Sequence, residues 1–169
     1  LNIIIKIYKL KSKISNVFFD LDHTLWDFEK NSALAFEVIF EKHKIRVNLE
    51  QFLKYYVPIN LKYWEIFRQD KITQNQLRYG RLKEAFTLLD YEIDDEKINF
   101  ISAEYIHYLP KFNHLFDGVI EILDYLQPNY ELHIITNGFA EIQYNKLNNA
   151  KIASYFKTVT NSEMAGVKK

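Results

Sequence analysis

Two short apolar runs, each followed at once by polar residues, constrain the fold of this chain more than any other feature. The first, residues 17–19, leads into Asp20 and Asp22; the second, residues 131–135, leads into Thr136. Short β-branched and aromatic runs bounded by turn signals predict strands of a buried parallel sheet. Because ligands bind at the carboxyl ends of parallel strands, the polar residues that follow both runs are expected to share one site.

The two acids after the first run suit phosphoryl transfer. Attack on a phosphate monoester needs a nucleophile that carries no proton, and an aspartate with an ordinary pKa of about 4 is ionised at neutral pH. The departing alkoxide needs a positioned acid, which a second carboxyl can supply before it deprotonates the attacking water. The plain alternative is that Asp20 and Asp22 only end a strand, since Asp favours turns.

Residues 18–25, Phe-Phe-Asp-Leu-Asp-His-Thr-Leu, resemble the first motif of the haloacid dehalogenase (HAD) superfamily, an apolar strand followed by Asp-x-Asp-x-Thr. The resemblance implies that Asp20 is the nucleophile and Asp22 the general acid/base. It implies that Thr24 supports the turn and the phosphate site, and that Asp20 and Asp22 help to bind Mg²⁺. In this superfamily the second Asp is found in phosphatases and phosphomutases, so Asp22 points to phosphatase chemistry.

The second run is similar to the second motif of the superfamily, because it ends in Thr-Asn-Gly. By that resemblance, the hydroxyl of Thr136 and the backbone N–H of Asn137 hold phosphate oxygens. Gly138 would let the backbone approach the phosphate closely. Alone, Thr-Asn-Gly is a common turn; the pairing with the first motif, in this order, makes it specific.

A third motif supplies a lysine after a further strand, which we expect at residues 156–160. Lys169 is the better candidate for this lysine, and Lys168 is the other candidate. The alternative is that both lysines only form a solvated basic terminus. The acids of the fourth motif, which complete the metal site, have no counterpart. We therefore expect the chain to be an N-terminal portion of the complete enzyme, with little or no activity by itself.

The residues between the two motifs repeat apolar side chains at the spacing of buried helical stripes. A helical bundle placed after the catalytic strand can close over the acids and exclude water. The predicted boundaries are Asn31 or Ser32 as the cap of the first helix, a break or kink at Pro58, a capping box at Thr73 and Gln76, and Asp94 and Pro110 as the start and end of the last helix.

Together these features predict an α/β fold: an incomplete HAD-like, doubly wound parallel sheet with an inserted all-helical cap. We expect the core at 14–29 and 106–169, the cap at 30–105, and an extension outside the fold at 1–13. Sheets of the superfamily usually run in the order 5-4-1-2-3, so an incomplete sheet would uncover one side of the first strand. An inactive fragment that acts only as an interaction module is therefore an alternative.

Composition narrows the class of partner. Lys plus Arg equals Asp plus Glu at 22 each, which argues against nucleic-acid or membrane binding. The absence of cysteine removes disulfides, thiol catalysis and cysteine-ligated zinc, and a reducing cytoplasm is the expected location. Hydrophobic residues make up 48% of the chain, which is enough for a packed core.

The run from Phe18 to Phe28, with the later Ile-Thr-Asn-Gly, looks most like the noncanonical pyrimidine nucleotidase group. The resemblance implies a Mg²⁺-dependent 5'-nucleotidase that acts on nucleoside monophosphates through an aspartyl phosphate. A sugar phosphatase or a phosphomutase is the alternative within the fold, and the oligomeric state is open. Four aromatic residues are candidates for stacking on a base, with packing in the core as the alternative: Trp26, Phe28, Tyr63 and Trp64. Three arginines are candidates for binding a phosphate or a base, although a solvated helix surface is the better interpretation for each: Arg68, Arg78 and Arg81.

Overall fold

The computed structural model describes residues 14–169, and the extension expected at 1–13 lies outside the described residues. Contacts divide the described chain into two compact units. The core unit holds the residues up to Asp27 together with Asn113–Lys169, and the inserted unit is Phe28–Phe112. These limits lie a few residues from the expected boundaries of core and cap.

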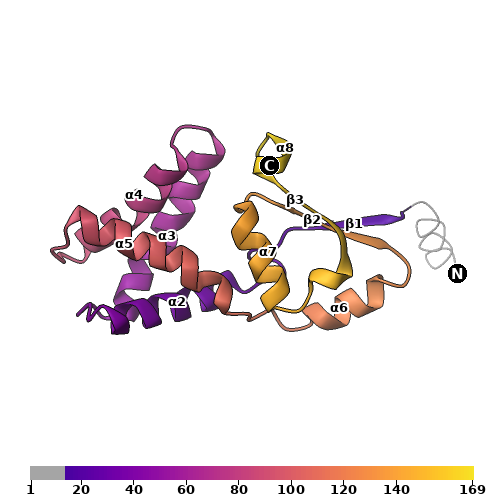
Figure 1. Ribbon diagram of the computed structural model, residues 1–169, viewed down its shortest axis with the longest axis horizontal. Coiled ribbons are helices and arrows are strands. Elements are labelled where there is room, and N and C mark those ends of the chain that lie inside the picture. Colours follow the sequence, from indigo (N-terminus) through magenta and orange to yellow (C-terminus); the bar gives the residue numbers. More distant parts are fainter. Residues whose placement is uncertain (1–13) are drawn as a thin grey trace, which may run out of the picture. The chain divides into compact units, whose positions relative to one another are not determined.

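The core unit is built on three parallel strands, β1 (Asn16–Phe19), β2 (Glu131–Thr136) and β3 (Phe156–Asn161), in the order β1-β2-β3 (Figure 1). Right-handed crossovers between successive parallel strands place their connecting helices on one face of a sheet. The parallel sheet predicted from the two apolar runs and from residues 156–160 is confirmed. The other elements of this unit are α6 (Val119–Leu126), α7 (Ala140–Asn149), the 3-10 turn η2 (Ala153–Tyr155) and the short helix α8 (Ser162–Ala165).

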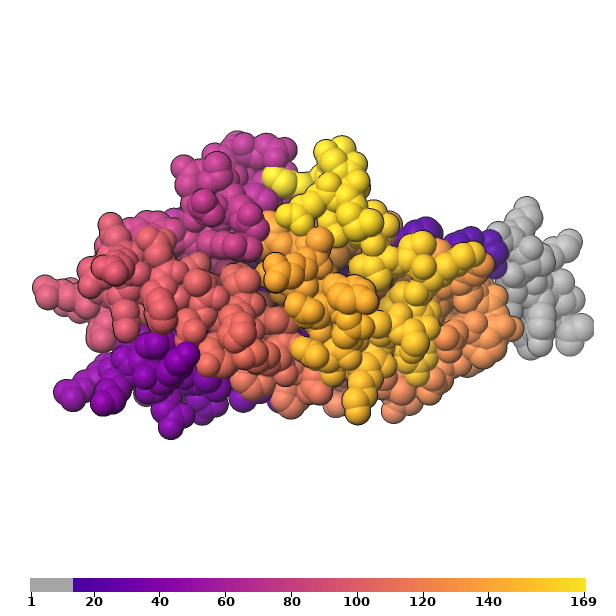
Figure 2. Space-filling model, viewed as in Figure 1, coloured from indigo at the N-terminus to yellow at the C-terminus, as the bar shows by residue number. Residues whose placement is uncertain are grey.

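The two faces of this sheet differ in exposure, because side chains alternate along each strand. Leu132 and Ile134 point to one face and are almost fully buried, whereas Phe18 points to the other and is 57% exposed. In the space-filling view, indigo atoms of the segment that holds β1 remain visible at the edge of the core unit, beside yellow atoms of its C-terminal segment (Figure 2). We call the face that bears Phe18 the open face.

A buried histidine joins all three strands on the open face. His133 of β2 is 6% exposed, and its Nε2 and Nδ1 atoms lie 2.7 Å from Asn16 Oδ1 on β1 and 2.7 Å from Thr158 Oγ1 on β3. A neutral imidazole satisfies both partners, since Nε2–H donates to the amide oxygen and Nδ1 accepts from the hydroxyl. The ring also stacks on Phe18, with 4.6 Å between ring centroids.

The inserted unit leaves and rejoins the core at one place. The N–H of Asp27 donates to the carbonyl of His114, and the N–H of Phe116 donates to the carbonyl of Leu25, each over 3.1 Å. We call these four residues the neck. The segments that enter and leave the insertion are therefore bonded to each other within the core unit.

The described part of the insertion is helical, as predicted, and its centre is aromatic. The ring centroid of Phe36 lies 4.8 Å from Phe52, 4.7 Å from Tyr56 and 4.5 Å from Tyr105. No helix of residues 14–169 combines the length and the apolar character that a membrane span requires. The helices are α2 (Phe28–Lys42), α3 (Leu49–Arg68), α4 (Gln74–Leu88) and α5 (Asp95–Tyr108), followed by the 3-10 turn η1 (Leu109–Lys111).

The capping residues expected for α4 and α5 are confirmed. Thr73 Oγ1 accepts from the N–H of Gln76 over 3.2 Å, and Gln76 Oε1 accepts from the N–H of Thr73 over 2.8 Å. Asp94 Oδ1 accepts from the N–H of Lys97 over 2.7 Å. Pro110 follows the last residue of α5 and lies in η1, as its predicted role requires.

The start predicted for the first inserted helix is wrong. Helix α2 begins at Phe28, so Asn31 and Ser32 lie inside it and are buried rather than capping its end. Both residue types are good caps, and the sequence alone did not weigh them against the burial that Phe28 gains in the first turn. Ser32 Oγ instead lies 2.9 Å from the hydroxyl of Tyr105 on α5.

The break predicted at Pro58 is also wrong, whereas the alternative of a kink there stays a prediction. Helix α3 runs through Pro58 as one element of 20 residues. Proline removes one hydrogen bond from the helical ladder. Here Tyr56 and Ile59, on either side, are buried against the rest of the insertion, and this packing offsets the missing bond.

Candidate active site

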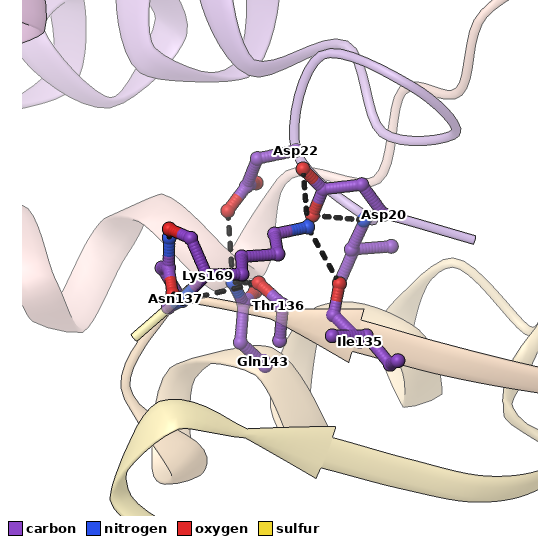
Figure 3. Close-up of polar contacts among 9 residues, drawn as sticks. Asp20, Asp22, Ile135, Thr136, Asn137, Gln143 and Lys169 are labelled. Atoms are coloured by element: carbon purple, nitrogen blue, oxygen red, sulfur yellow. Dashed lines mark hydrogen bonds and ion pairs between the residues drawn. The ribbon is translucent and has the colours of Figure 1, made fainter. Parts of the chain in front are cut away.

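Asp20 lies at the carboxyl end of β1 and faces a lysine from the other end of the chain (Figure 3). Its Oδ2 atom is 2.8 Å from Lys169 Nζ, and its Oδ1 atom accepts from the N–H of Leu21 over 2.8 Å. The side chain of Asp20 is 38% exposed and that of Lys169 is 39% exposed. The carboxylate is thus oriented by two donors and open to an incoming group.

Asn137 and the end of β2 hold this lysine in place. Lys169 Nζ donates to the carbonyl of Ile135 over 2.8 Å. The side-chain amide of Asn137 accepts from the N–H of Lys169 and donates to its carbonyl, each over 2.9 Å. Of the two lysines considered, the structure therefore brings Lys169 to Asp20. The side chain of Asn137 orients that lysine, a contact that the sequence did not predict.

Thr136, at the end of β2, is 3% exposed and has a defined hydrogen-bonding role. Its Oγ1 atom accepts from the N–H of Gly138 over 3.1 Å and from Gln143 Nε2 over 2.9 Å. A hydroxyl has two acceptor positions and one hydrogen. Since both acceptor positions are used, the hydrogen remains available to donate to a phosphate oxygen.

Asp22 is held from α7 by two residues that the sequence did not identify. Its Oδ2 atom accepts from Gln143 Nε2 over 2.8 Å, and its Oδ1 atom accepts from Lys146 Nζ over 2.6 Å. Lys146 is 2% exposed, and its Nζ lies 4.2 Å from the ring centroid of Trp26. The signal for both residues was present: they stand on the buried stripe of α7 that also holds Ile142 and Leu147, where polar side chains are unusual.

Thr24 lies apart from this network. The turn after β1 is tight: His23 has a left-handed φ of 61°, and the N–H of Trp26 donates to the carbonyl of Leu21 over 2.9 Å. The N–H of Thr24 donates to the same carbonyl over 3.3 Å, and its side chain is exposed. Thr24 thus belongs to the turn, and its role toward the phosphate stays a prediction.

Glycine is needed at position 138 because the side chain of Gln143 occupies the space of a Cβ atom, and its backbone angles do not themselves demand glycine. A Cβ atom at this position would lie 1.7 Å from Gln143 Nε2 and 2.4 Å from Gln143 Cδ. The side chain of Gln143 therefore crosses directly over the glycine to reach Thr136 and Asp22. The sequence attributed Gly138 to close approach of the backbone to a phosphate; the structure adds a close approach by Gln143.

The donor set at this site fits a hard cation in part. Carboxylate oxygens are the ligands that Mg²⁺ prefers, and the exposed carboxylate of Asp20 is accessible to it. Both oxygens of Asp22 already accept from nitrogen donors. Within residues 14–169, no group of three or more His, Cys, Asp or Glu side chains is placed to hold a metal ion.

Arg81, one of the cap residues considered for substrate binding, is buried in the inserted unit. Arg81, expected on a solvated helix surface, is 3% exposed, so that interpretation is wrong for this residue. Its Nη1 donates to Asn60 Oδ1 over 2.7 Å, and its guanidinium carbon lies 5.8 Å and 5.1 Å from the ring centroids of Tyr56 and Tyr105. Aromatic packing inside the insertion thus compensates its charge in part.

Comparison with known proteins identifies the family. The model of the haloacid dehalogenase-like hydrolases matches residues 17–169, and the chain belongs to this family. It is 30% identical over 152 residues to the pyrimidine 5'-nucleotidase PynA of Streptococcus pneumoniae, covering 89% of this chain and 62% of PynA. It is 30% identical over 155 residues to the pyrimidine 5'-nucleotidase YjjG of Escherichia coli, covering 90% of this chain and 64% of YjjG.

A solved structure agrees with this assignment. The crystal structure of the HAD-hydrolase YfnB of Bacillus subtilis, bound to magnesium, matches with a TM-score of 0.82 at 28% identity, and the match covers 92% of this chain and 68% of that one. The chain spans a little under two thirds of the length of PynA and YjjG. The predicted superfamily and fold are therefore confirmed.

Proposed function

We propose that the protein is a Mg²⁺-dependent phosphate monoester hydrolase that works through an aspartyl phosphate, and that its substrates are pyrimidine nucleoside monophosphates. The observation that carries the proposal is the carboxylate of Asp20, exposed at the strand end with Lys169 Nζ at 2.8 Å and Thr136 on the neighbouring strand. A nucleophile, a cation and a hydroxyl donor at one sheet edge suit a phosphate group.

In the first step, an oxygen of Asp20 attacks phosphorus while the bond from phosphorus to the ester oxygen breaks. The leaving oxygen takes a proton from Asp22, which acts as the general acid. Lys169 balances negative charge between the nucleophile and the phosphate, and Thr136 donates its hydroxyl hydrogen to a phosphate oxygen. The products of this step are the free alcohol, here a nucleoside, and the phosphorylated Asp20.

In the second step, water attacks the phosphorus of the aspartyl phosphate. Asp22, now the carboxylate, accepts a proton from this water, and the bond between phosphorus and the Asp20 oxygen breaks. Inorganic phosphate leaves, Asp20 returns as a carboxylate, and Asp22 is again protonated. The two adjacent acids thus take different roles within one cycle.

Asp20 and Asp22 are the described residues that would hold Mg²⁺. Asp20 would bind it through its carboxylate, and Asp22 would contribute from the same strand end. A bound Mg²⁺ would neutralise phosphate charge and orient the phosphate toward Asp20. Because residues 14–169 bring only these two acids to the site, we propose that the 169-residue chain by itself turns substrate over slowly.

The substrate class rests on the relatives. Two proteins 30% identical to this chain carry the name pyrimidine 5'-nucleotidase. The proposed location remains the cytoplasm, on the composition argument given for the sequence. A screen of nucleoside monophosphates and sugar phosphates separates this proposal from a sugar phosphatase, and transfer of phosphate to a sugar hydroxyl instead of water would indicate a phosphomutase.

The decisive experiment is an Asp20→Asn substitution in the full-length gene product that contains these residues. Loss of the nucleophile is expected to abolish Mg²⁺-dependent phosphate release from UMP and from p-nitrophenyl phosphate. Glu131→Gln, an exposed acid at the opposite end of β2, is the matched control and is expected to keep the parent rate. An Asp20→Asn enzyme that hydrolysed both substrates at the parent rate would refute the mechanism.

A further inference from the structure

The surroundings of Asp22 contain more organisation than a strand terminus needs. Its two carboxylate oxygens accept from two different residues, Gln143 and Lys146, which stand three residues apart and so share one side of α7. The terminal torsion of an aspartate is broad when the carboxylate is free. Donors on both oxygens fix the plane of the carboxylate as well as its position.

We call Gln143 and Lys146, which donate to the two oxygens of Asp22, the clamp. Both residues are buried, and burying their polar groups costs stability. Lys146 is 2% exposed, and a buried ammonium is tolerated only with a partner, which Asp22 supplies. Gln143 is 1% exposed, and no described residue donates to its Oε1 atom. An unsatisfied buried acceptor destabilises a fold, so the site keeps Gln143 at a cost in stability.

A single amide group also joins Asp22 to the phosphate-binding hydroxyl. Gln143 Nε2 donates one hydrogen to Asp22 over 2.8 Å and the other to Thr136 over 2.9 Å. The orientation of the amide follows from chemistry, because an ionised carboxylate only accepts. Gln143 therefore fixes where the Asp22 carboxylate lies relative to the Thr136 hydroxyl.

We infer that Gln143 and Lys146 are positioning residues that hold Asp22, as the carboxylate, toward the water that hydrolyses the aspartyl phosphate. The inference rests on the proposed function and assigns the two residues to its second step. In that step the water O–H bond breaks, the proton moves to Asp22, and the bond between phosphorus and the Asp20 oxygen breaks. The first step needs the protonated form of Asp22, whereas the doubly accepting geometry matches the form that removes a proton from water.

The kinetic test uses Lys146→Met and Gln143→Leu in the full-length gene product, with p-nitrophenyl phosphate and Mg²⁺. A slower second step accumulates the aspartyl phosphate, so kcat is expected to fall about 10- to 100-fold, with KM falling in proportion and kcat/KM kept within about 3-fold. A burst that approaches one p-nitrophenolate per enzyme is expected to appear. Lys146→Arg, which can still donate, is expected to restore most of kcat.

Lys157→Met is the matched control for the loss of a lysine paired with an acid. Lys157 pairs with Glu131 on the surface, at the opposite end of the strands from Asp20, and its substitution is expected to leave kcat and KM unchanged. A fall in kcat/KM equal to the fall in kcat, without a burst, would show that Lys146 and Gln143 only support the fold, and would overturn the inference.

A second measurement decides the matter without activity. In ¹⁵N-labelled 169-residue chain, the side-chain amide hydrogens of Gln143 are expected to exchange with water at least about 10-fold more slowly than those of exposed Gln127. Asp22→Ala is expected to remove most of this protection. If the full-length parent shows no turnover, the proposed function fails, while slow exchange that depends on Asp22 still supports the clamp. Fast exchange of the Gln143 amide hydrogens in the parent chain would overturn the inference.

Discussion

Gly138→Ala is expected to destabilise the core unit strongly, and only because Gln143 is present. The new methyl group would lie 1.7 Å from Gln143 Nε2 and 2.8 Å from its Cγ, so the side chain must move. The far end of a glutamine moves at little steric cost. The penalty therefore comes from the hydrogen bonds that it makes to Asp22 and Thr136.

The size of the effect follows from those two bonds. A hydrogen bond to a charged group contributes about 1.5–3 kcal/mol and one between neutral groups about 0.5–1.5 kcal/mol, so the loss is about 2–4.5 kcal/mol. Gln143→Ala removes the obstacle. In that background the three atoms nearest the new methyl group are gone and the φ of residue 138 is not in the left-handed region, so the effect of Gly138→Ala is expected to lie within about 1 kcal/mol of zero.

The assay is a double-mutant cycle by urea unfolding of the 169-residue chain. The sequence has two tryptophans, Trp26 in the core unit and Trp64 in the inserted unit, so a Trp64→Phe background makes fluorescence report on the core alone. The expected coupling is about 2–4.5 kcal/mol. Effects of Gly138→Ala that agreed within about 0.5 kcal/mol in both backgrounds would refute the account of Gly138.

Three further predictions concern elements outside this cluster. Thr73→Ala removes the capping box of α4 and is expected to cost about 1 kcal/mol, measured by urea unfolding of the inserted unit through Trp64 fluorescence; no change in midpoint would contradict it. Burial raises the pKa of Tyr105 well above its ordinary value of 10. The stability that the neutral phenol contributes is fully present below pH 10 and is lost as pH rises further. Because phenylalanine has no phenol to ionise, Tyr105→Phe is expected to unfold at a higher pH than the parent in a titration followed by tyrosinate absorbance. His133→Ala leaves Asn16 and Thr158 without their shared partner and is expected to cost about 2–3 kcal/mol, whereas Lys157→Ala on the surface is expected to cost far less; equal shifts would argue against a cross-strand tie.

Much of the fold could be predicted because local signals agree with it. The strands ending at Phe19 and Thr136 are short apolar runs, and the caps at Thr73 and Asp94 satisfy their own helix ends within three residues. The errors arose where tertiary packing decides. Burial extends α2 back to Phe28 and carries α3 through Pro58, and neither effect is visible in a window of a few residues.

The residues of the candidate site also fall into a group that the sequence predicted and a group that it missed. Asp20 follows β1, Thr136 ends β2 and Lys169 comes shortly after β3, so their placement is set by the topology of a parallel sheet. Gln143 and Lys146 are different, because α7 must pack against the turn after β1 before either can reach Asp22. Sequence spacing places them on the buried stripe of α7, but the acid that they meet is more than 100 positions away along the chain.

The neck has a consequence for how such a protein can be rearranged. Leu25 and Asp27 are bonded to Phe116 and His114, so the whole insertion begins and ends at one paired spot. Removing it or grafting another in its place leaves the core with ends that already meet, and the entropy of closing the new loop grows only slowly with its length. Recombination at this junction would therefore exchange one insertion for another while Leu21, Gln143, Lys146 and Lys169, which hydrogen-bond to Asp20 or Asp22, all stay within the core unit.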